Sequence, residues 1–398
     1  MDFIVNEPNR VCEPFFESFD DLFTRPNQRE GFRAYVLGLL SETHRKNVER
    51  ISERVISQHY QSLHHFLVES PWDAPALNDR RIEMLLADPH TRPRPEGALI
   101  IDDSGVPKKG KATEGVKRQY IGQRGKVENG QVFVTSHYAD FDRHWPLDIS
   151  PFMPDVCFDG GKADPEYRTK IDRALDLVDA AVKRGITFRD VVADSFYGSN
   201  LHFVDTLEER GLKYVVELKP SMHIYRRLPG DIARNEHRLD EALALLKPQD
   251  FRPVRLRSHD GTERELYHAR LDVKIKKWTG KRRVVVATND PIHPEKDDDI
   301  RFLTTNDVTL RDETVVRVYA LRNWIEVFYR EAKSDLGAGQ YQVRGIESIV
   351  RHWLLVFTAY TFVQTLFQDG CLGRWCKKKF IPSDKRSWPC ATTSGFTS

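Results

Sequence analysis

The first ninety residues show the apolar spacing of helices. Five apolar side chains recur there at intervals that a helix places largely on one side, namely Val48, Ile51, Val55, Leu63 and Phe66. Pro71 follows this run, and proline rarely continues a helix because it lacks a backbone N–H donor. We therefore expect a helical segment over residues 1–92.

Short apolar runs replace this helical spacing from about residue 97 onward. Their length and their content of β-branched residues are typical of buried strands, and longer amphipathic stretches separate them. The expected elements are, in order, strands at 98–101, 118–122 and 131–138, a helix at 167–184, a strand at 191–194, a helix at 201–210 and a strand at 214–218. This alternation predicts an α/β core whose first part is 93–221.

The alternation stops at residue 222. Short β-like segments follow at 273–275 and 284–287, separated by a turn-forming Trp-Thr-Gly sequence, and we expect a β-rich insertion over 222–308. Helical spacing returns over 309–370. The last residues, 371–398, are rich in Lys, Arg, Ser and Pro and predict a basic, flexible tail.

Composition excludes several classes of protein. The 398 residues are 40% hydrophobic and 30% charged, which excludes a wholly disordered or fibrous chain. Because 61 Lys and Arg face 59 Asp and Glu, the net charge is +2, and any contact with nucleic acid must come from where the charges lie. The most apolar stretch, 353–363, is too short to cross a bilayer, and the few scattered cysteines fit a reducing compartment. We expect a cytoplasmic protein with no membrane contact.

Acids follow two of the predicted strands. Asp103 and Asp194 would each present a carboxylate at the edge of a sheet, and carboxylate oxygens are the ligands that Mg²⁺ prefers. Adjacent residues of a strand point to opposite faces, so Asp102 and Asp103 cannot both line one site.

A third acid is expected on the C-terminal helical segment. On this helix, Tyr319, Arg322, Glu326 and Lys333 fall within an arc of about 60° beside the apolar stripe. Glu331 falls on the far side and is the weaker candidate. From periodicity alone, a solvated salt-bridge face is the favoured interpretation, and one side of a cleft is the alternative.

These four residues also repeat the signature of a protein family. Their pattern, Tyr-x2-Arg-x3-Glu-x6-Lys, resembles the Y-R-E-K signature of the DDE insertion-sequence transposases, the bacterial cut-and-paste group. Residues 101–110 resemble the first-aspartate motif of that family. Residues 193–198 resemble the second, although Phe196 stands where a small residue is expected. The likeness runs from about residue 45 to about residue 360.

The resemblance implies an RNase H-like catalytic core with a β-rich insertion before the last catalytic helix, preceded by a helical DNA-binding domain. It designates Asp103, Asp194 and Glu326 as catalytic residues and as ligands of two Mg²⁺ ions, for which Mn²⁺ would substitute. Asp102 is the second choice for the first position. Tyr319, Arg322 and Lys333 would hold DNA phosphates near the metals.

Two stretches concentrate basic residues and are expected to contact DNA. The first lies beside Asp103 and the second surrounds Trp278, which would stack on an unpaired base. Their predicted contact residues are Lys108, Lys109, Lys111, Lys117 and Arg118 in the first, and Lys276, Lys277, Trp278, Lys281 and Arg282 in the second. Solvated lysines and a packed tryptophan are the structural alternative.

The predicted function is DNA transposition. The protein would bind the terminal inverted repeats of an insertion sequence, cleave the element ends with Mg²⁺ and join the 3′-OH ends to target DNA, as a homodimer on DNA in the bacterial nucleoid. Two alternatives are a transposase-derived regulator or accessory factor that binds DNA without strand transfer, and an RNase H-like nuclease that does not join ends.

Overall fold

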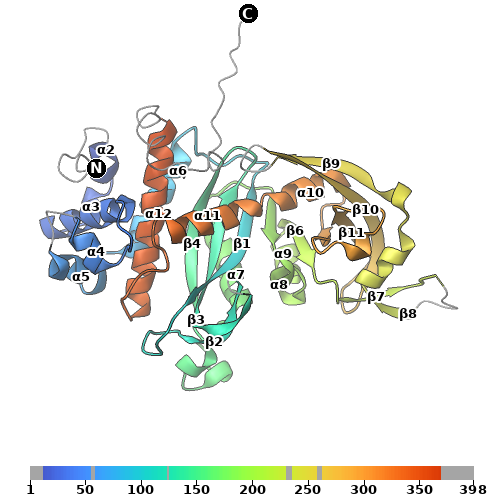
Figure 1. Ribbon diagram of the computed structural model, residues 1–398, viewed down its shortest axis with the longest axis horizontal. Coiled ribbons are helices and arrows are strands. Elements are labelled where there is room, and N and C mark those ends of the chain that lie inside the picture. Colours follow the sequence, from blue (N-terminus) through green and yellow to red (C-terminus); the bar gives the residue numbers. More distant parts are fainter. Residues whose placement is uncertain (1–11, 55–58, 123–124, 230–234, 258–261, 369–398) are drawn as a thin grey trace, which may run out of the picture. The chain divides into compact units, whose positions relative to one another are not determined.

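The computed structural model describes residues 12–54, 59–122, 125–229, 235–257 and 262–368. The chain divides into two compact units (Figure 1). The first is formed by the residues up to Val191 together with Ile325–Leu366, and the second contains Val192–Trp324. The segment bounds expected from the sequence stay a prediction.

The first unit begins with helices. They are α2 (Glu13–Glu17), α3 (Pro26–Leu40), α4 (Val48–Ser52), α5 (Tyr60–Val68) and α6 (Ala74–Ala87). Aromatic rings join these helices to the C-terminal helix α12 (Ile346–Gln368), since Phe16 stacks on Phe362 with 5.5 Å between centroids. The helical spacing of the sequence is therefore realised here, in several short helices.

The sheet of the first unit has the strand order β2-β3-β1-β5, and β4 also pairs with β3. The strands are β1 (Ala98–Pro107), β2 (Lys117–Ile121), β3 (Lys126–Ala139), β4 (His144–Phe152) and β5 (Asp190–Ala193), where the division between the units falls. Strand β4 was not predicted; it contains Pro146 and Pro151, and proline seldom occurs inside a strand.

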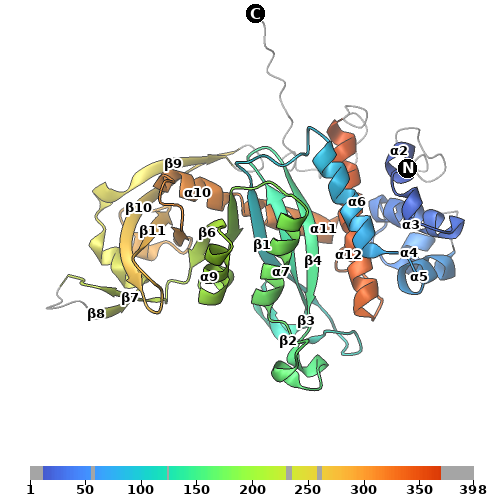
Figure 2. The same cartoon turned by 180° about the vertical axis from the view of Figure 1, so that it is seen from behind.

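Helices cover both faces of this sheet. Helices α11 (Asn323–Ser334) and α12 lie on one face (Figure 1), and α7 (Lys170–Lys183) lies on the other (Figure 2). Thr169 caps α7 by accepting a hydrogen bond from the Asp172 amide, and Gly185 follows its end with a φ of 72°. The helix predicted at 167–184 is thus confirmed except for its first residues.

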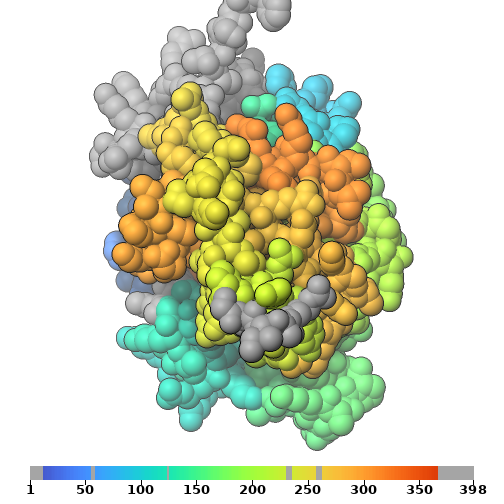
Figure 3. All heavy atoms as spheres, turned by 90° about the vertical axis from the view of Figure 1, so that its right-hand side faces the viewer, coloured from blue at the N-terminus to red at the C-terminus, as the bar shows by residue number. Residues whose placement is uncertain are grey.

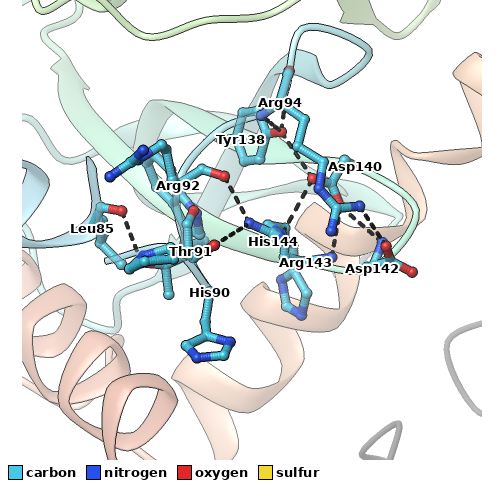
Figure 4. A network of polar contacts seen from close by, with 12 residues as sticks. Leu85, His90, Thr91, Arg92, Arg94, Tyr138, Asp140, Asp142, Arg143 and His144 are labelled. Carbon is cyan, nitrogen blue, oxygen red and sulfur yellow. Dashed lines mark hydrogen bonds and ion pairs between the residues drawn. The ribbon is translucent and has the colours of Figure 1, made fainter. Parts of the chain in front are cut away.

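The β3–β4 turn is organised by one buried carboxylate, Asp140 (Figure 4). It accepts hydrogen bonds from the amides of Asp142 and Arg143 at 2.8 and 2.9 Å and from the Tyr138 hydroxyl at 3.0 Å. The same hydroxyl accepts a bond from the Arg94 amide, so the turn holds the segment that leads from α6 into β1.

Buried hydrogen bonds fix the loop between α11 and α12. The His352 ring lies 2.8 Å from the Tyr35 hydroxyl and 3.1 Å from the Gly337 carbonyl. Burial lowers the pKa of His352 to about 4. The neutral ring therefore accepts from Tyr35 and donates to Gly337, which ties α3 and this loop to α12.

The second unit is built on antiparallel strands in the order β6-β12-β11-β10-β7-β8, with β9 also paired to β10. Its strands are β6 (Lys213–Leu218), β7 (His223–Arg226), β8 (Asn235–Arg238), β9 (Arg252–Arg257), β10 (Glu263–Ile275), β11 (Arg282–Thr288) and β12 (Arg301–Thr305). Its helices are α8 (Ser195–Gly198), α9 (Leu201–Glu209) and α10 (Asp312–Ala320). Figure 3 looks onto this unit, where the yellow residues around β9 form much of the visible face.

The β-like segments at 273–275 and 284–287 fall inside β10 and β11. The predicted tail at 371–398 lies outside the described residues. Within the described parts of the chain, no helix is long and apolar enough to cross a membrane.

Candidate active site and DNA-contact residues

Asp102 and Asp103 lie in the middle of β1. The expected strand end at residue 101 is wrong, because the strand continues in register with β3 as far as Pro107. Asp102 pairs with Thr135 of β3, and Asp103 pairs with Val134. Paired residues of antiparallel strands share a face, so the two aspartates lie on opposite faces of the sheet.

Asp102 lies on the face covered by α11. The hydroxyl of Thr135, its partner across the ladder, is hydrogen-bonded to the hydroxyl of Tyr329 on α11. Two residues further along β3, on the same face, the His137 ring packs on Phe328 of α11 with 5.4 Å between centroids. Asp102 therefore shares a face with the helix that carries Glu326.

Asp103 lies on the face covered by α7. Its Oδ2 accepts a hydrogen bond from Lys170 Nζ, the first residue of α7, at 2.8 Å. Arg173 of α7 donates to the Ser150 hydroxyl of β4, and Ser150 pairs with Val134, the residue opposite Asp103. The assignment of Asp103, taken from the family pattern, stays a prediction. The geometry of the strand favours Asp102 as the partner of Glu326.

Glu326 and Lys333 lie seven residues apart on α11 and so face in nearly the same direction, two turns apart. Glu326 is exposed in the first turn, where the helix dipole favours a negative charge. Lys333 donates from Nζ to the Gly105 carbonyl of β1 at 3.2 Å. Burial lowers the pKa of Lys333 to about 8, and the charges of Asp102 and Asp103 oppose this shift.

Glu331 packs inside the protein, away from the predicted site residues, as its place on the far side of the helix suggested. It is buried and accepts a hydrogen bond from the Tyr360 hydroxyl of α12 at 3.0 Å. Burial raises the pKa of Glu331 to about 7. It packs between two helices and belongs to no candidate site.

Tyr319 and Arg322 do not share a helix with Glu326, so the single-helix arc expected for the four signature residues is wrong. Helix α10 ends at Ala320 and α11 begins at Asn323. Between them, the amides of Arg322 and Trp324 bond to carbonyls three residues back, at 3.0 and 3.1 Å, which breaks the register of the α-helix. Neither Gly nor Pro marks this break in the sequence.

Asp194 lies where the sequence predicted it, directly after the buried strand β5. Its Oδ1 caps α8 by accepting hydrogen bonds from the amides of Phe196 and Tyr197 at 2.9 and 3.4 Å. Helix α8 packs directly on β6, since a Cβ on Gly198 would lie 2.2 Å from the Glu217 carbonyl oxygen. Glycine is therefore required at 198, and the position of Asp194 is fixed by backbone contacts.

Glu217 is a second acid near Asp194, and the sequence pattern did not single it out. It accepts a hydrogen bond from the Tyr319 hydroxyl at 2.6 Å and lies 3.6 Å from the Arg301 guanidinium. Burial raises the pKa of Glu217, and the charge of Asp194 adds to this shift while the hydrogen bond from Tyr319 opposes it. The only signal in the sequence was an acid inside an otherwise apolar strand.

Tyr319 thus has a different environment from the one expected of a phosphate-holding residue. Its hydroxyl donates to Glu217, and burial with the charge of Glu217 raises the pKa of the phenol. Arg322 and Asp194 both act on the pKa of this phenol, so the second unit brings together Asp194, Glu217, Tyr319 and Arg322.

Two residues of the first basic stretch are held by the protein itself. Lys108 places Nζ 3.4 Å from the centre of the Tyr341 ring, and burial lowers its pKa to about 8. Lys117 forms an ion pair with Asp155. The prediction that Lys108 contacts phosphate does not fit this packed position. The other three predicted contacts, Lys109, Lys111 and Arg118, have exposed side chains.

The second basic stretch forms the β10–β11 hairpin, but its tryptophan faces inward. Trp278 is 4% exposed, and the guanidinium of Arg282 lies 5.4 Å from its ring. Arg282 is itself paired with Glu208 at 2.7 Å. The expected stacking of Trp278 on a base is therefore wrong for this conformation, because a buried ring presents no face to DNA. Lys276, paired with Glu236 at 2.7 Å, remains exposed, as do Lys277 and Lys281.

The predicted metal ligands come from both units. Asp102, Asp103 and Glu326 belong to the first and Asp194 to the second. Among the residues that the structure describes, no three His, Cys, Asp or Glu side chains form a group that could hold a metal ion. The carboxylate donors themselves are of the kind that a hard divalent cation takes.

Comparison with known proteins identifies the class. The sequence model of the family described as DDE superfamily endonuclease matches residues 17–278, well over half of the chain. This protein belongs to that family, and its mixed α/β architecture fits a DDE, RNase H-like domain. Endonucleases of this family generally use divalent metal ions.

A named relative narrows the class to transposases. The chain is 30% identical over 372 residues to the "Probable transposase for insertion sequence element IS701" of Microchaete diplosiphon, covering 92% of this chain and 89% of that protein. The resemblance to DDE insertion-sequence transposases, drawn from the sequence motifs, is confirmed.

Proposed function

We propose that this protein is the transposase of an insertion sequence. It binds the terminal inverted repeats of the element, cleaves the DNA at the element ends and joins the 3′-OH ends to target DNA as a homodimer. One structural observation supports this most directly: α11 carries Glu326 and Lys333 on the face of the sheet that also carries Asp102. A carboxylate and an ammonium group held on one rigid helix, beside a second carboxylate on the sheet, suit phosphodiester chemistry.

The proposed ligand set for Mg²⁺ consists of Asp194, Glu326 and one aspartate of β1. These acids come from both units, and we group them in one ligand set because the chain belongs to the DDE family. Two bound ions would stabilise the attacking and leaving oxygens of an in-line displacement. Lys333 and Arg322 would hold phosphate oxygens with their cations. Glu217 would orient Tyr319 through their 2.6 Å hydrogen bond.

The test uses a DNA duplex that carries the inverted repeat flanking the encoding gene. Asp194→Ala and Glu326→Ala should bind this duplex as the wild type does and should lose cleavage in Mg²⁺ and in Mn²⁺. Glu331→Gln, a change of a buried acid on the same helix as Glu326, is the control that should retain cleavage. If both alanine variants cleaved at the wild-type rate, the proposal would be wrong.

A DNA-binding regulator without catalysis is not favoured, since the similarity to a transposase covers most of the chain and the acids of the family pattern are all present. Joining of the cleaved ends is tested separately. With a supercoiled target plasmid added, wild-type protein should yield joined products, and cleaved ends without joined products would indicate a nuclease that does not transfer strands.

A further inference from the structure

An exposed aromatic ring lies two residues after Asp194. Phe196 on α8 is 43% exposed, although its neighbour Tyr197 is almost fully buried and packs on Phe203 with 5.6 Å between centroids. The close contact of Gly198 with β6 fixes which side of this short helix faces the core. Phe196 is thereby held on the outer side, with its ring edge-to-face against Tyr197 at 5.0 Å.

A cation accompanies this ring. Lys219, directly after β6, places Nζ 5.9 Å from the centre of the Phe196 ring, and its side chain is exposed. The backbone amide of Lys219 donates to the Ser199 hydroxyl just after α8 at 2.8 Å, so the two segments are tied together. The ammonium group of Lys219 thus lies over one face of the Phe196 ring, and an aromatic ring and a cation are presented together two residues after Asp194.

We propose that Phe196 and Lys219 form a platform for one unpaired base of the DNA beside the bond that is cut. The ring would stack on the base and the ammonium group would pair with its phosphate, the combination that proteins use to hold single-stranded nucleic acid. Trp278, the aromatic residue expected in this role, is buried. Phe196 also departs from the small residue that the family pattern places there, so the platform is a feature of this chain.

This inference rests on the proposed function, and it is tested by cleavage of the element-end duplex. Phe196→Ala should slow cleavage by about 5-fold to 100-fold, the range expected when one base is no longer stacked. Phe196→Trp should stay within about threefold of wild type, and Phe196→Leu, which keeps the bulk without the ring, should be slowed like Phe196→Ala. Phe141→Ala is the control, since Phe141 is 56% exposed in the β3–β4 turn, and it should not change the rate.

A second measurement identifies the base. In this experiment, the cleavage rates of wild type and of Phe196→Ala are measured on a set of duplexes, each of which lacks one base near the cut site. At one position, removal of the base should slow the wild type and should have no further effect on Phe196→Ala, because that variant has no ring on which the base could stack. In Lys219→Ala, removal of the base at that position should still slow cleavage, but less than in the wild type.

Three results would overturn the platform. They are cleavage by Phe196→Ala within twofold of wild type, a wild-type rate for Phe196→Leu, and an effect of the missing base that persists undiminished in Phe196→Ala. Because Phe196 is exposed, its variants should fold, and melting temperatures with gel-shift binding check this. If the wild type itself failed to cleave the duplex, the proposed function would fail rather than the platform.

Discussion

At the scale of single residues, the central finding concerns two neighbouring acids. Asp102 and Asp103 both follow the same apolar run, so the apolar pattern does not separate them, and only the family resemblance put Asp103 first. The ladder with β3 places one on the α11 face and the other on the α7 face, where Lys170 pairs with Asp103. A residue's chemical role here depends on which helix covers its face.

This division gives a prediction that separates the two acids. Asp102→Asn should reduce metal-dependent cleavage at least 100-fold, because it removes a carboxylate from the face of Glu326, whereas Asp103→Asn should reduce it about tenfold or less. Cleavage rates of both variants in Mg²⁺ and Mn²⁺ provide the measurement, and gel-shift binding of the end duplex provides the control. The reverse order of effects would restore the assignment taken from the family pattern.

At the scale of elements, the four residues of the Y-R-E-K signature lie in two separate helices and the break between them. The break after Ala320 separates Tyr319 from Glu326, although the sequence between them carries no helix breaker. Helix α11 is then fixed by contacts on both sides, with Tyr329 bonded to the sheet and Glu331 bonded to Tyr360 of α12.

The Glu331–Tyr360 contact predicts a dependence of stability on pH. The pKa of Glu331 is about 7 in the folded protein and near its ordinary 4.5 in the unfolded chain. The carboxyl is protonated in both states below about pH 4.5, and its contribution to stability is complete there. Above pH 4.5 the carboxyl ionises in the unfolded chain but stays protonated in the folded protein, which favours unfolding. The contribution therefore falls as pH rises and is lost as pH passes through 7.

Glu331→Gln should therefore remove part of this pH dependence. We compare the free energy of unfolding of the variant with that of the wild type at each pH. The variant's advantage should be larger at pH 8 than at pH 4.5, by on the order of 2 kcal/mol. Thermal or urea unfolding of both proteins at the two pH values measures the difference. Parallel pH profiles for the two proteins would contradict the assignment of Glu331 as the group responsible.

At the scale of the whole molecule, the net charge of +2 conceals separate basic surfaces. Of the basic stretch beside β1, Lys109, Lys111 and Arg118 are exposed, whereas Lys108 is packed against Tyr341. Binding of DNA by a nearly neutral protein must come from such local groups.

The salt dependence of DNA binding tests this surface. In a variant carrying Lys109→Ala, Lys111→Ala and Arg118→Ala, the slope of log K against log salt should become shallower by about 0.9 for each phosphate that the variant no longer neutralises. Fluorescence anisotropy over a salt series gives the slope. Lys276→Ala, which removes a lysine already paired with Glu236, should change it less. An unchanged slope in the triple variant would exclude this surface from DNA contact.

The sequence by itself determined the local structure and the family. The apolar spacing placed α7, β5, α9 and β6 to within a few residues, and the acid after β5 was found at Asp194. These features follow from propensities and periodicity, which act between near neighbours in the chain. The Y-R-E-K pattern was likewise sufficient by itself to indicate the family.

The tertiary structure alone decided how the side chains of the candidate site are used. It divided Asp102 from Asp103, buried Trp278, packed Lys108 against Tyr341, exposed Phe196 and brought Glu217 to Tyr319. Each of these outcomes depends on residues distant in sequence, such as Tyr341 for Lys108 and Glu217 for Tyr319. Burial and pairing of a side chain are set by what packs against it, and the local pattern of a sequence does not contain that information.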